Sequence, residues 1–211
     1  MTVAEDFTLL ALMDVDGKPL IGNLQLECGL AAALLVELAE QGRIDVDGDG
    51  IVVRDVTPLG KPDEDAALAR IAETKPHDFA WWVSSLRSGL AQTTLARLVA
   101  QGVVTEERVR RFGIFSHTRH PLADPGSAHA VRERLSAVLQ GESAEPRAVA
   151  LLSLSHATGL DRLILPESTP AGVEQRLNQL GATATADAVA KVVKNVNAAV
   201  VAAVTAATAG I

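Results

Sequence analysis

Apolar positions recur at helical spacing over most of the chain, and two short alternating stretches interrupt them. Leucines within residues 7–13 predict a first helix, and an apolar run over about 24–41 predicts a longer one that ends at Gly42. The next stretch, 44–53, alternates between apolar and polar residues around an Asp-Gly turn. This alternation predicts a β-hairpin directly after the second helix.

The order helix, glycine and strand occurs twice along the chain. The segments LVELAEQGRIDV and LARLVAQGVVTE share this pattern, and the second leads into an arginine-rich ribbon. The copies lie about sixty residues apart, and two copies are too few for a solenoid. We interpret them as two helix–hairpin units within one core.

Further helices are predicted from the same periodicity. Their expected ranges are 63–73, 78–86, 127–140, 146–158, 170–180 and 187–207. Ser127 and Thr169 are expected to be N-caps, and Pro170 suits a first helical position. The last helix falls short of the ~20 apolar residues that span a bilayer, so we expect it in the core. The predicted fold class is mainly α: a compact single-domain helical bundle over residues 1–211, with two short β-hairpins and a buried C-terminal helix.

Composition narrows the possible functions. Hydrophobic residues make up 48% of the chain, which predicts an ordered core, and the formal net charge of −7 disfavours a nucleic-acid partner. The single cysteine, Cys28, excludes an intramolecular disulfide framework. Together with an N-terminus whose acids are unlike a secretory signal, it predicts a cytoplasmic protein. Any membrane association would then be peripheral.

The stretch RVRRFGIFSHTRHPL, between residues 108 and 122, is the most informative part of the sequence. It holds two of only four phenylalanines, with four arginines around them. Its glycine and proline argue against one continuous helix, so we predict an extended ribbon. Apolar groups among guanidinium groups suit an anionic interface, because the apolar groups leave water while the cations stay at the phosphate layer. The predicted membrane-contact residues are Arg108, Arg110, Arg111, Phe112, Ile114, Phe115 and Arg119.

Residues that could support catalysis or metal binding form no complete set. The DVDGDG turn copies the first half of an EF-hand loop, but the twelfth position is Val56, so its acids are interpreted as turn formers. His117 and His120 would face opposite sides of a ribbon, and Cys28 is expected to pack as a small hydrophobe. No nucleophile elbow, P-loop or dinucleotide motif occurs. We therefore expect no enzyme, no cofactor and no metal site.

Seven segments follow one another in a recognisable order. They are the leucine-rich first helix with DVDGKP, CGLAAALLVELAEQGRIDV, ARIAETKPHDFAWWV, LARLVAQGVVTEE, FGIFSHTRHPL, LLSLSHATGL and AAVVAAVTAA. Together they resemble the Golgi phosphoprotein 3 family over almost the whole chain. The resemblance implies a mostly helical domain without catalytic activity. Eukaryotic members bind phosphatidylinositol 4-phosphate, and a hydrophobic hairpin that matches Phe112, Ile114 and Phe115 helps them to contact membranes and to oligomerise.

The lipid pocket of the eukaryotic members does not carry over to this chain. The positions that match its Trp and Arg residues are Gly22, Ala31, Ser88 and Ala91, or Gln92 if the alignment shifts by one. None offers the charged donors that phosphate recognition requires. Arg87 is the nearest cation. Trp81 and Trp82 point roughly 100° apart on a helix, so one is expected in the core and the other at a groove or surface. Trp81 and Arg87 are the candidate lipid-binding residues.

The leading hypothesis is a peripheral protein that contacts an anionic phospholipid surface, with phosphoinositide as one candidate lipid. Abundant alanine, valine and arginine suggest a bacterial chain, which places that surface at the inner face of the plasma membrane. Three alternatives stay open at this point. They are a winged-helix-like DNA-binding regulator, a module that forms homo-oligomers through the ribbon, and a ribbon that packs into the core.

Overall fold

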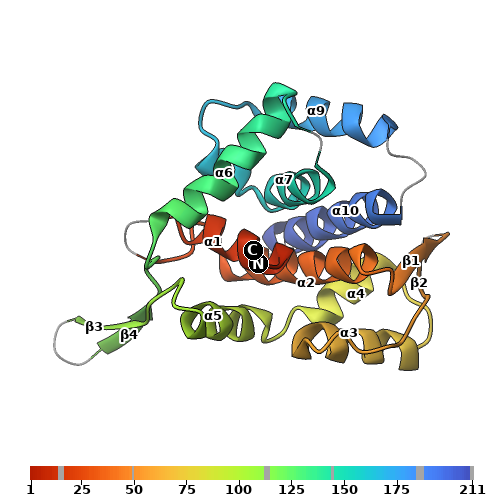
Figure 1. The fold of residues 1–211 in the computed structure, drawn as a ribbon, viewed down its shortest axis with the longest axis horizontal. Helices are drawn as coiled ribbons and strands as arrows, with labels where there is room; N and C mark the ends of the chain where they lie inside the picture. Colours follow the sequence, from red (N-terminus) through yellow and green to blue (C-terminus); the bar gives the residue numbers. More distant parts are fainter. Residues whose placement is uncertain (14–16, 49, 112–114, 144, 184–187, 210–211) are drawn as a thin grey trace.

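The computed structural model describes residues 1–13, 17–48, 50–111, 115–143, 145–183 and 188–209, and helices make up most of it (Figure 1). The helices are α1 (Val3–Ala11), α2 (Asn23–Glu40), α3 (Pro62–Glu73), α4 (Phe79–Leu86), α5 (Leu90–Ala100), α6 (Pro125–Gln140), α7 (Pro146–Thr158), α8 (Asp161–Ile164), α9 (Pro170–Thr183) and α10 (Ala188–Ala209). The strands form two antiparallel hairpins, β1 (Ile44–Asp47) with β2 (Gly50–Val53) and β3 (Glu107–Arg111) with β4 (Phe115–Arg119). The mainly α fold class is confirmed.

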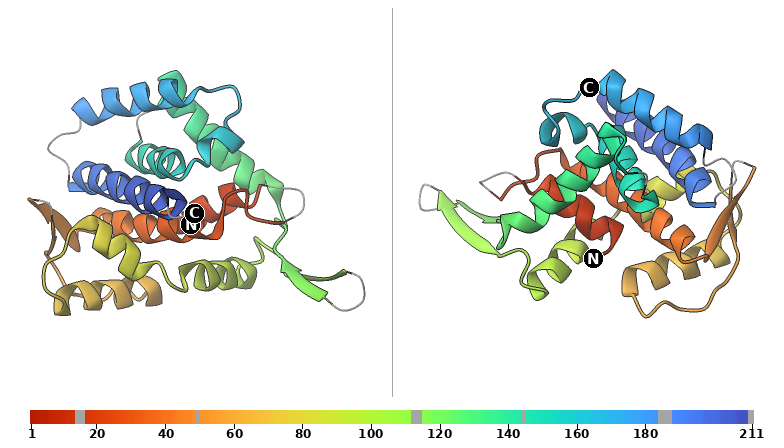
Figure 2. Two further views of the ribbon diagram at one scale, coloured as in Figure 1. Left: turned by 180° about the vertical axis from the view of Figure 1, so that it is seen from behind. Right: turned by 45° about the horizontal axis from the view of Figure 1, so that its top comes forward.

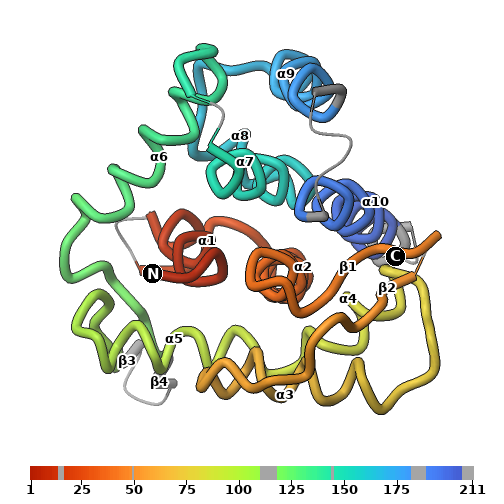
Figure 3. The backbone as a smooth tube through the Cα atoms, turned by 45° about the vertical axis from the view of Figure 1, so that its right-hand side comes forward, coloured from red at the N-terminus to blue at the C-terminus, as the bar shows by residue number. Residues whose placement is uncertain are grey.

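Helix α2 is the centre of the core. Its residues from Cys28 to Ala39 are all buried, as expected for a helix that is apolar around its whole circumference. Figure 3 shows α2 nearly end-on, with α1, α7, α10, α3 and α4 arranged around it. Because α2 is covered on every side, it cannot enter a DNA groove. In the winged-helix alternative, the helix before each hairpin would be a candidate recognition helix, so one of these two helices is excluded.

The two predicted helix–hairpin units are confirmed, and they end their helices in the same way. Gly42 and Gly102 adopt φ angles of 64° and 72°, a left-handed conformation that favours glycine. In both units the amide that follows the glycine donates to a carbonyl five residues back. These bonds join Arg43 N to Leu38 O at 2.8 Å and Val103 N to Leu98 O at 3.0 Å. Each cap turns the chain so that the second residue after the glycine, Ile44 or Val104, is buried.

The two hairpins then diverge. The β1–β2 hairpin lies against α10 and α3. In the second unit, Val104 pairs with Leu122 through an isolated bridge, and both pack with Leu9, Leu12 and Leu98. Beyond that bridge, β3–β4 extends away from the helices, as the views in Figures 1 and 2 show. The core at this end is therefore built from the base of the ribbon.

Several helix boundaries follow from local chemistry. Helix α1 begins earlier than predicted, because Thr2 and Glu5 form a capping box with bonds of 2.8 and 3.1 Å. The prediction of Ser127 as an N-cap is wrong. Asp124 caps α6 by accepting the amide of Gly126 at 2.9 Å, and the proline that follows Asp124 occupies the first helical position. The predicted cap at Thr169 is confirmed by a 3.1 Å bond from the Gly172 amide.

Helix α10 buries one face in the core, as predicted. Val192, Val196 and Val200 are completely buried where α10 packs against α2, α7 and α4. Val201 on another face is 49% exposed, so the helix lies at the edge of the core with its other side toward solvent. Within the described residues, no helix is long and apolar enough to cross a bilayer.

Candidate functional site

The β3–β4 hairpin is the most distinctive surface feature of the molecule. Its register pairs Arg108 with Thr118 and Arg110 with Ser116. Because strand positions alternate between faces, these four residues occupy one face of the ribbon. Of these positions, Arg108 and Thr118 have exposed side chains, and a guanidinium and a hydroxyl group can both donate hydrogen bonds to phosphate oxygens.

The opposite face of the hairpin is mixed. The register assigns to it the pairs Glu107 with Arg119, Val109 with His117, and Arg111 with Phe115. Among the described side chains, Arg108 and Thr118 are exposed, whereas Val109 and Arg119 are half-buried. The predicted contact residues Phe112 and Ile114 lie outside the described residues.

Charge is concentrated in this hairpin. Residues 107–119 contain four arginines and a single glutamate, in a chain whose formal net charge is −7. The remainder of the protein is therefore more acidic than the whole, and an anionic surface would repel it. Any attraction to such a surface comes from a local patch, and the hairpin projects far enough to present one without bringing the acidic body closer (Figure 1).

Trp81 and Trp82 divide as predicted between surface and core. Asp78 caps α4 by accepting the Trp81 amide at 2.8 Å, which fixes the first turn of this helix. Trp82 is 1% exposed and packs in the main core, whereas Trp81 is 38% exposed. The Trp81 ring stacks on His77 with centroids 3.8 Å apart, so one of its faces is already covered.

Arg87, the second candidate lipid-binding residue, already has an acidic partner. Its guanidinium lies 3.7 Å from the carboxylate of Glu27 on α2, and Asn23 donates to the same carboxylate at 3.2 Å. This ion pair joins the start of α2 to the end of α4, the region that holds the lipid pocket in the eukaryotic members. The corresponding positions supply no cation: Gly22 caps α2, Ala31 is fully buried, and Ser88 and Gln92 are exposed neutral residues.

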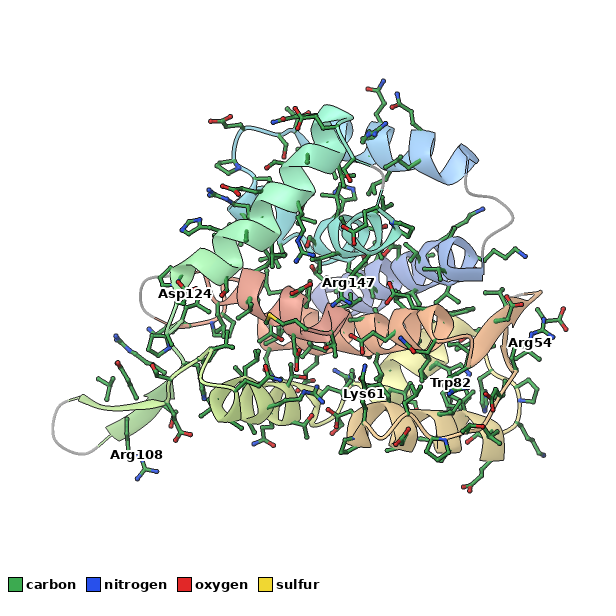
Figure 4. All side chains as sticks on the ribbon, viewed as in Figure 1. Arg54, Lys61, Trp82, Arg108, Asp124 and Arg147 are labelled. Carbon is green, nitrogen blue, oxygen red and sulfur yellow. The ribbon has the colours of Figure 1, made fainter. Side chains whose placement is uncertain are left out.

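The two sets of candidate residues do not form one site. Trp82, in edge contact with Trp81, and Arg108 are labelled in Figure 4 near opposite ends of the molecule. Arg87 lies beyond the last turn of α4, six residues after Trp81, and points toward α2. Six residues along a helix correspond to roughly 240°, so Trp81 and Arg87 lie on different faces.

Asp45 of the DVDGDG turn and His156 of α7 have structural contacts. Asp45 accepts hydrogen bonds from Arg54 at 2.9 Å and from the Val46 amide at 2.8 Å, which keep the pKa of Asp45 below its usual range. His156 Nδ1 lies 2.7 Å from Asp161 and joins α7 to α8. Among the described residues, no group of three or more His, Cys, Asp or Glu side chains is arranged to hold a metal.

Cys28 is completely buried, as predicted for a residue that packs as a small hydrophobe. Burial raises the pKa of its thiol, which disfavours the reactive thiolate, although the charge of Arg87 acts in the opposite direction.

Two features were missed in the sequence. One is a cleft of about 530 Å³ between β2, the end of α3 and Trp82, whose walls include Ile51, Val53 and Ile71. The other is a pair of buried glutamates, Glu37 and Glu64. A signal existed for the pair, since Glu37 stands in the apolar run LLVELA of a buried helix. The cleft has no such signal, because its walls come from separate segments.

The fold and the hairpin define a helical protein with a projecting cationic β-ribbon. A family model described as Golgi phosphoprotein 3 (GPP34) matches residues 3–200. The chain therefore belongs to the Golgi phosphoprotein 3 family, and the resemblance drawn from its motifs is confirmed. The chain is also similar to vacuolar protein sorting-associated protein 74 of Eremothecium gossypii, with 26% identity over 169 residues. That match covers 69% of this chain and 51% of the relative, so the chain spans about half the relative's length.

Proposed function

We propose that this protein is a non-catalytic peripheral membrane protein of adaptor type that binds an anionic phospholipid surface through the β3–β4 hairpin. The observation that carries the proposal is the hairpin itself, which extends from the helical body and gathers four arginines in an acidic chain. Membership of the Golgi phosphoprotein 3 family supports it. We place the surface at the cytoplasmic face of a plasma membrane.

Electrostatic attraction supplies the first part of the binding. A basic residue near an anionic leaflet contributes about 1 kcal/mol, so the four arginines give about 4 kcal/mol, less what Glu107 costs. Screening limits the range of this attraction to about 10 Å at 0.1 M salt. Binding should therefore weaken as salt rises, and only groups that come close to the headgroups should contribute.

The face that holds Arg108, Arg110, Ser116 and Thr118 is the proposed headgroup surface. Its guanidinium and hydroxyl groups suit phosphate oxygens. Phe115, the first residue of β4 and the partner of Arg111, is proposed to contribute apolar contact together with Phe112 and Ile114. An apolar residue at this depth gains free energy by leaving water, whereas the arginines stay at the phosphate layer.

Lipid selectivity is proposed to be broad. The positions equivalent to the phosphatidylinositol 4-phosphate pocket offer no cation, and Arg87 beside them is paired with Glu27. Arginines on an open ribbon are expected to recognise charge density, whereas an enclosed pocket fixes one phosphate. We therefore expect phosphatidylglycerol and phosphatidylinositol 4-phosphate to support binding in proportion to their charge.

Co-sedimentation with vesicles tests the proposal. The double variant Arg108→Ala and Arg110→Ala should bind phosphatidylglycerol vesicles about thirtyfold more weakly, since two cations are worth about 2 kcal/mol. The matched control, Lys191→Ala with Lys194→Ala, removes the same charge from exposed positions on α10 and should bind like the parent. Equal losses in both variants would show that only net charge matters, and this result would overturn the hairpin proposal.

Phe115→Asp separates membrane contact from a role in folding. The variant should keep its helical content and its thermal unfolding midpoint, and it should lose vesicle binding. Unfolding of this variant would instead make Phe115 part of the core. Light scattering in the absence of lipid distinguishes membrane contact from pairing of two hairpins. If the ribbon joins two chains, Phe115→Asp should change the molecular mass measured in solution.

A further inference from the structure

Two glutamates from distant parts of the chain meet inside the protein. Glu37 of α2 is 4% exposed and Glu64 in the first turn of α3 is 1% exposed. Both residues line one small cavity of about 10 Å³, so their side chains meet at the same internal space. A space of this size holds about one water molecule.

The partners of the two carboxyl groups are few. Glu37 Oε1 accepts the backbone N–H of Ala4, in the first turn of α1, at 3.0 Å. Neither carboxyl oxygen of Glu64 accepts a hydrogen bond from any described residue, although Lys61 Nζ lies 3.4 Å from one of them. A buried carboxylate without donors is costly, whereas a protonated carboxyl group can donate to its neighbour.

The other charged groups around the pair are already engaged. Arg97 of α5 lies 3.1 Å from Glu5 of α1 and 3.2 Å from Asp63 of α3, so two acids share its charge. Lys61 is 42% exposed and is partly screened by water. The titratable and charged groups that surround the pair are Glu5 from α1, Lys61 before α3, Asp63 from α3 and Arg97 from α5.

We propose that a proton held by the Glu37 carboxyl group and donated toward Glu64 forms a pH-sensitive latch that holds the start of α3 against α1 and α2. With the proton present, the Glu37 carboxyl group donates to Glu64 across the cavity. Loss of the proton places two negative charges in a space too small to hydrate both. The first turn of α3 then moves away from α2 to admit water.

The direction of the pH dependence follows from the pKa of Glu37. Burial is the main cause that raises this pKa from 4.5 to about 7. The Ala4 amide and the Thr2 side chain lower it, whereas the charge of Glu64 and its hydrogen bond raise it. The folded protein therefore holds the proton more tightly than the unfolded chain between pH 4.5 and about 7. The stability that the proton provides is fully present below pH 4.5 and is lost as pH rises through about 7.

Urea unfolding between pH 5 and 8.5 tests the latch. In the parent, we expect the latch to lower the folding equilibrium constant by roughly a hundredfold across this range. Glu37→Gln should remove this decrease and be more stable than the parent at the alkaline end, because its amide still accepts from Ala4 and donates to Glu64. The matched control Glu73→Gln, at an exposed position on α3, should follow the parent. If stability changed with pH in the same way in the parent, Glu37→Gln and Glu73→Gln, the proposal would be overturned.

Glu64→Gln tests whether the two residues act as a pair. If the charge of Glu64 helps Glu37 to hold its proton, this change should shift the decrease in stability to lower pH, because it removes a neighbouring charge and adds a donor to Glu37. An unchanged profile would mean that Glu37 titrates alone, and it would overturn the latch even if Glu37→Gln failed to fold. Hydrogen exchange, corrected for its intrinsic pH dependence, should rise in α3 at alkaline pH and stay constant in α9; a uniform rise would also contradict the latch.

Discussion

Gly29 is the position where a single added methyl group should have the clearest effect on the core. It lies in the middle of α2, facing α1 and α7. A Cβ atom placed there would lie 2.4 Å from two ring carbons of Phe7 and 3.2 Å from the methyl group of Thr158. Phe7 is completely buried, and the Thr158 hydroxyl is bound to the Leu154 carbonyl at 2.9 Å, so neither neighbour can yield without disturbing its own contacts.

Two opposing effects set the size of the change in Gly29→Ala. Alanine is favoured over glycine inside a helix by about 1 kcal/mol. Overpacking of a close-packed core typically costs about 1–3 kcal/mol, and a 2.4 Å contact with a rigid ring lies at the upper end of that range. We therefore expect Gly29→Ala to lower the free energy of unfolding by about 1–2 kcal/mol. For a chain of 211 residues this corresponds to a fall in Tm of roughly 2–8 °C.

Thermal unfolding followed by circular dichroism measures this change. The double variant Gly29→Ala with Phe7→Leu provides the internal test, because a smaller side chain at position 7 leaves room for the methyl group. The double variant should lose less unfolding free energy than the sum of the losses in the two single variants, as expected for residues in contact. A Gly29→Ala protein as stable as the parent would refute the packing of α1 on α2 described here.

Two further substitutions test the core and the helix caps by the same method. Trp82→Ala should lower the free energy of unfolding by about 3–5 kcal/mol, because the ring is buried. Trp81→Ala should lower it far less, and equal effects would contradict the environments assigned to the two rings. Asp124→Ala should lower Tm and shorten α6, and Asp124→Ser, which keeps an acceptor oxygen, should restore both; a Tm unchanged by the alanine would contradict the cap.

The repeated local pattern made much of the fold predictable. A glycine after an apolar helix, followed by β-branched residues, defined both helix–hairpin units, and the predicted range of α7 agrees with its observed bounds. The short helix α8 was missed because four residues carry too little periodicity. The predicted cap of α6 differs from the observed one because Asp124 followed by proline is a stronger N-terminal signal than Ser127.

The candidate site was less predictable, because it depends on long-range contacts. The glycine and proline of the arginine-rich ribbon predicted an extended segment, but they could not show that it projects away from the described helices. The pairing of Arg87 with Glu27 joins residues far apart in the sequence, so only the folded chain reveals that this cation already has a partner. Helical geometry likewise predicted that one tryptophan of the adjacent pair is buried. It could not specify which one, and the structure shows that it is Trp82.

The most direct test of the central claim locates the membrane contact on the protein. Cys28 is the only cysteine and is completely buried, so an environment-sensitive fluorophore would label an introduced cysteine selectively. Thr118→Cys places it on the proposed headgroup face, and Ser84→Cys places it at an exposed position on α4, three residues from Trp81. On phosphatidylglycerol vesicles, we expect the fluorophore emission to shift to the blue at position 118 and to stay unchanged at position 84. A shift at 84 alone, or at neither position while the protein sediments with the vesicles, would contradict the central claim.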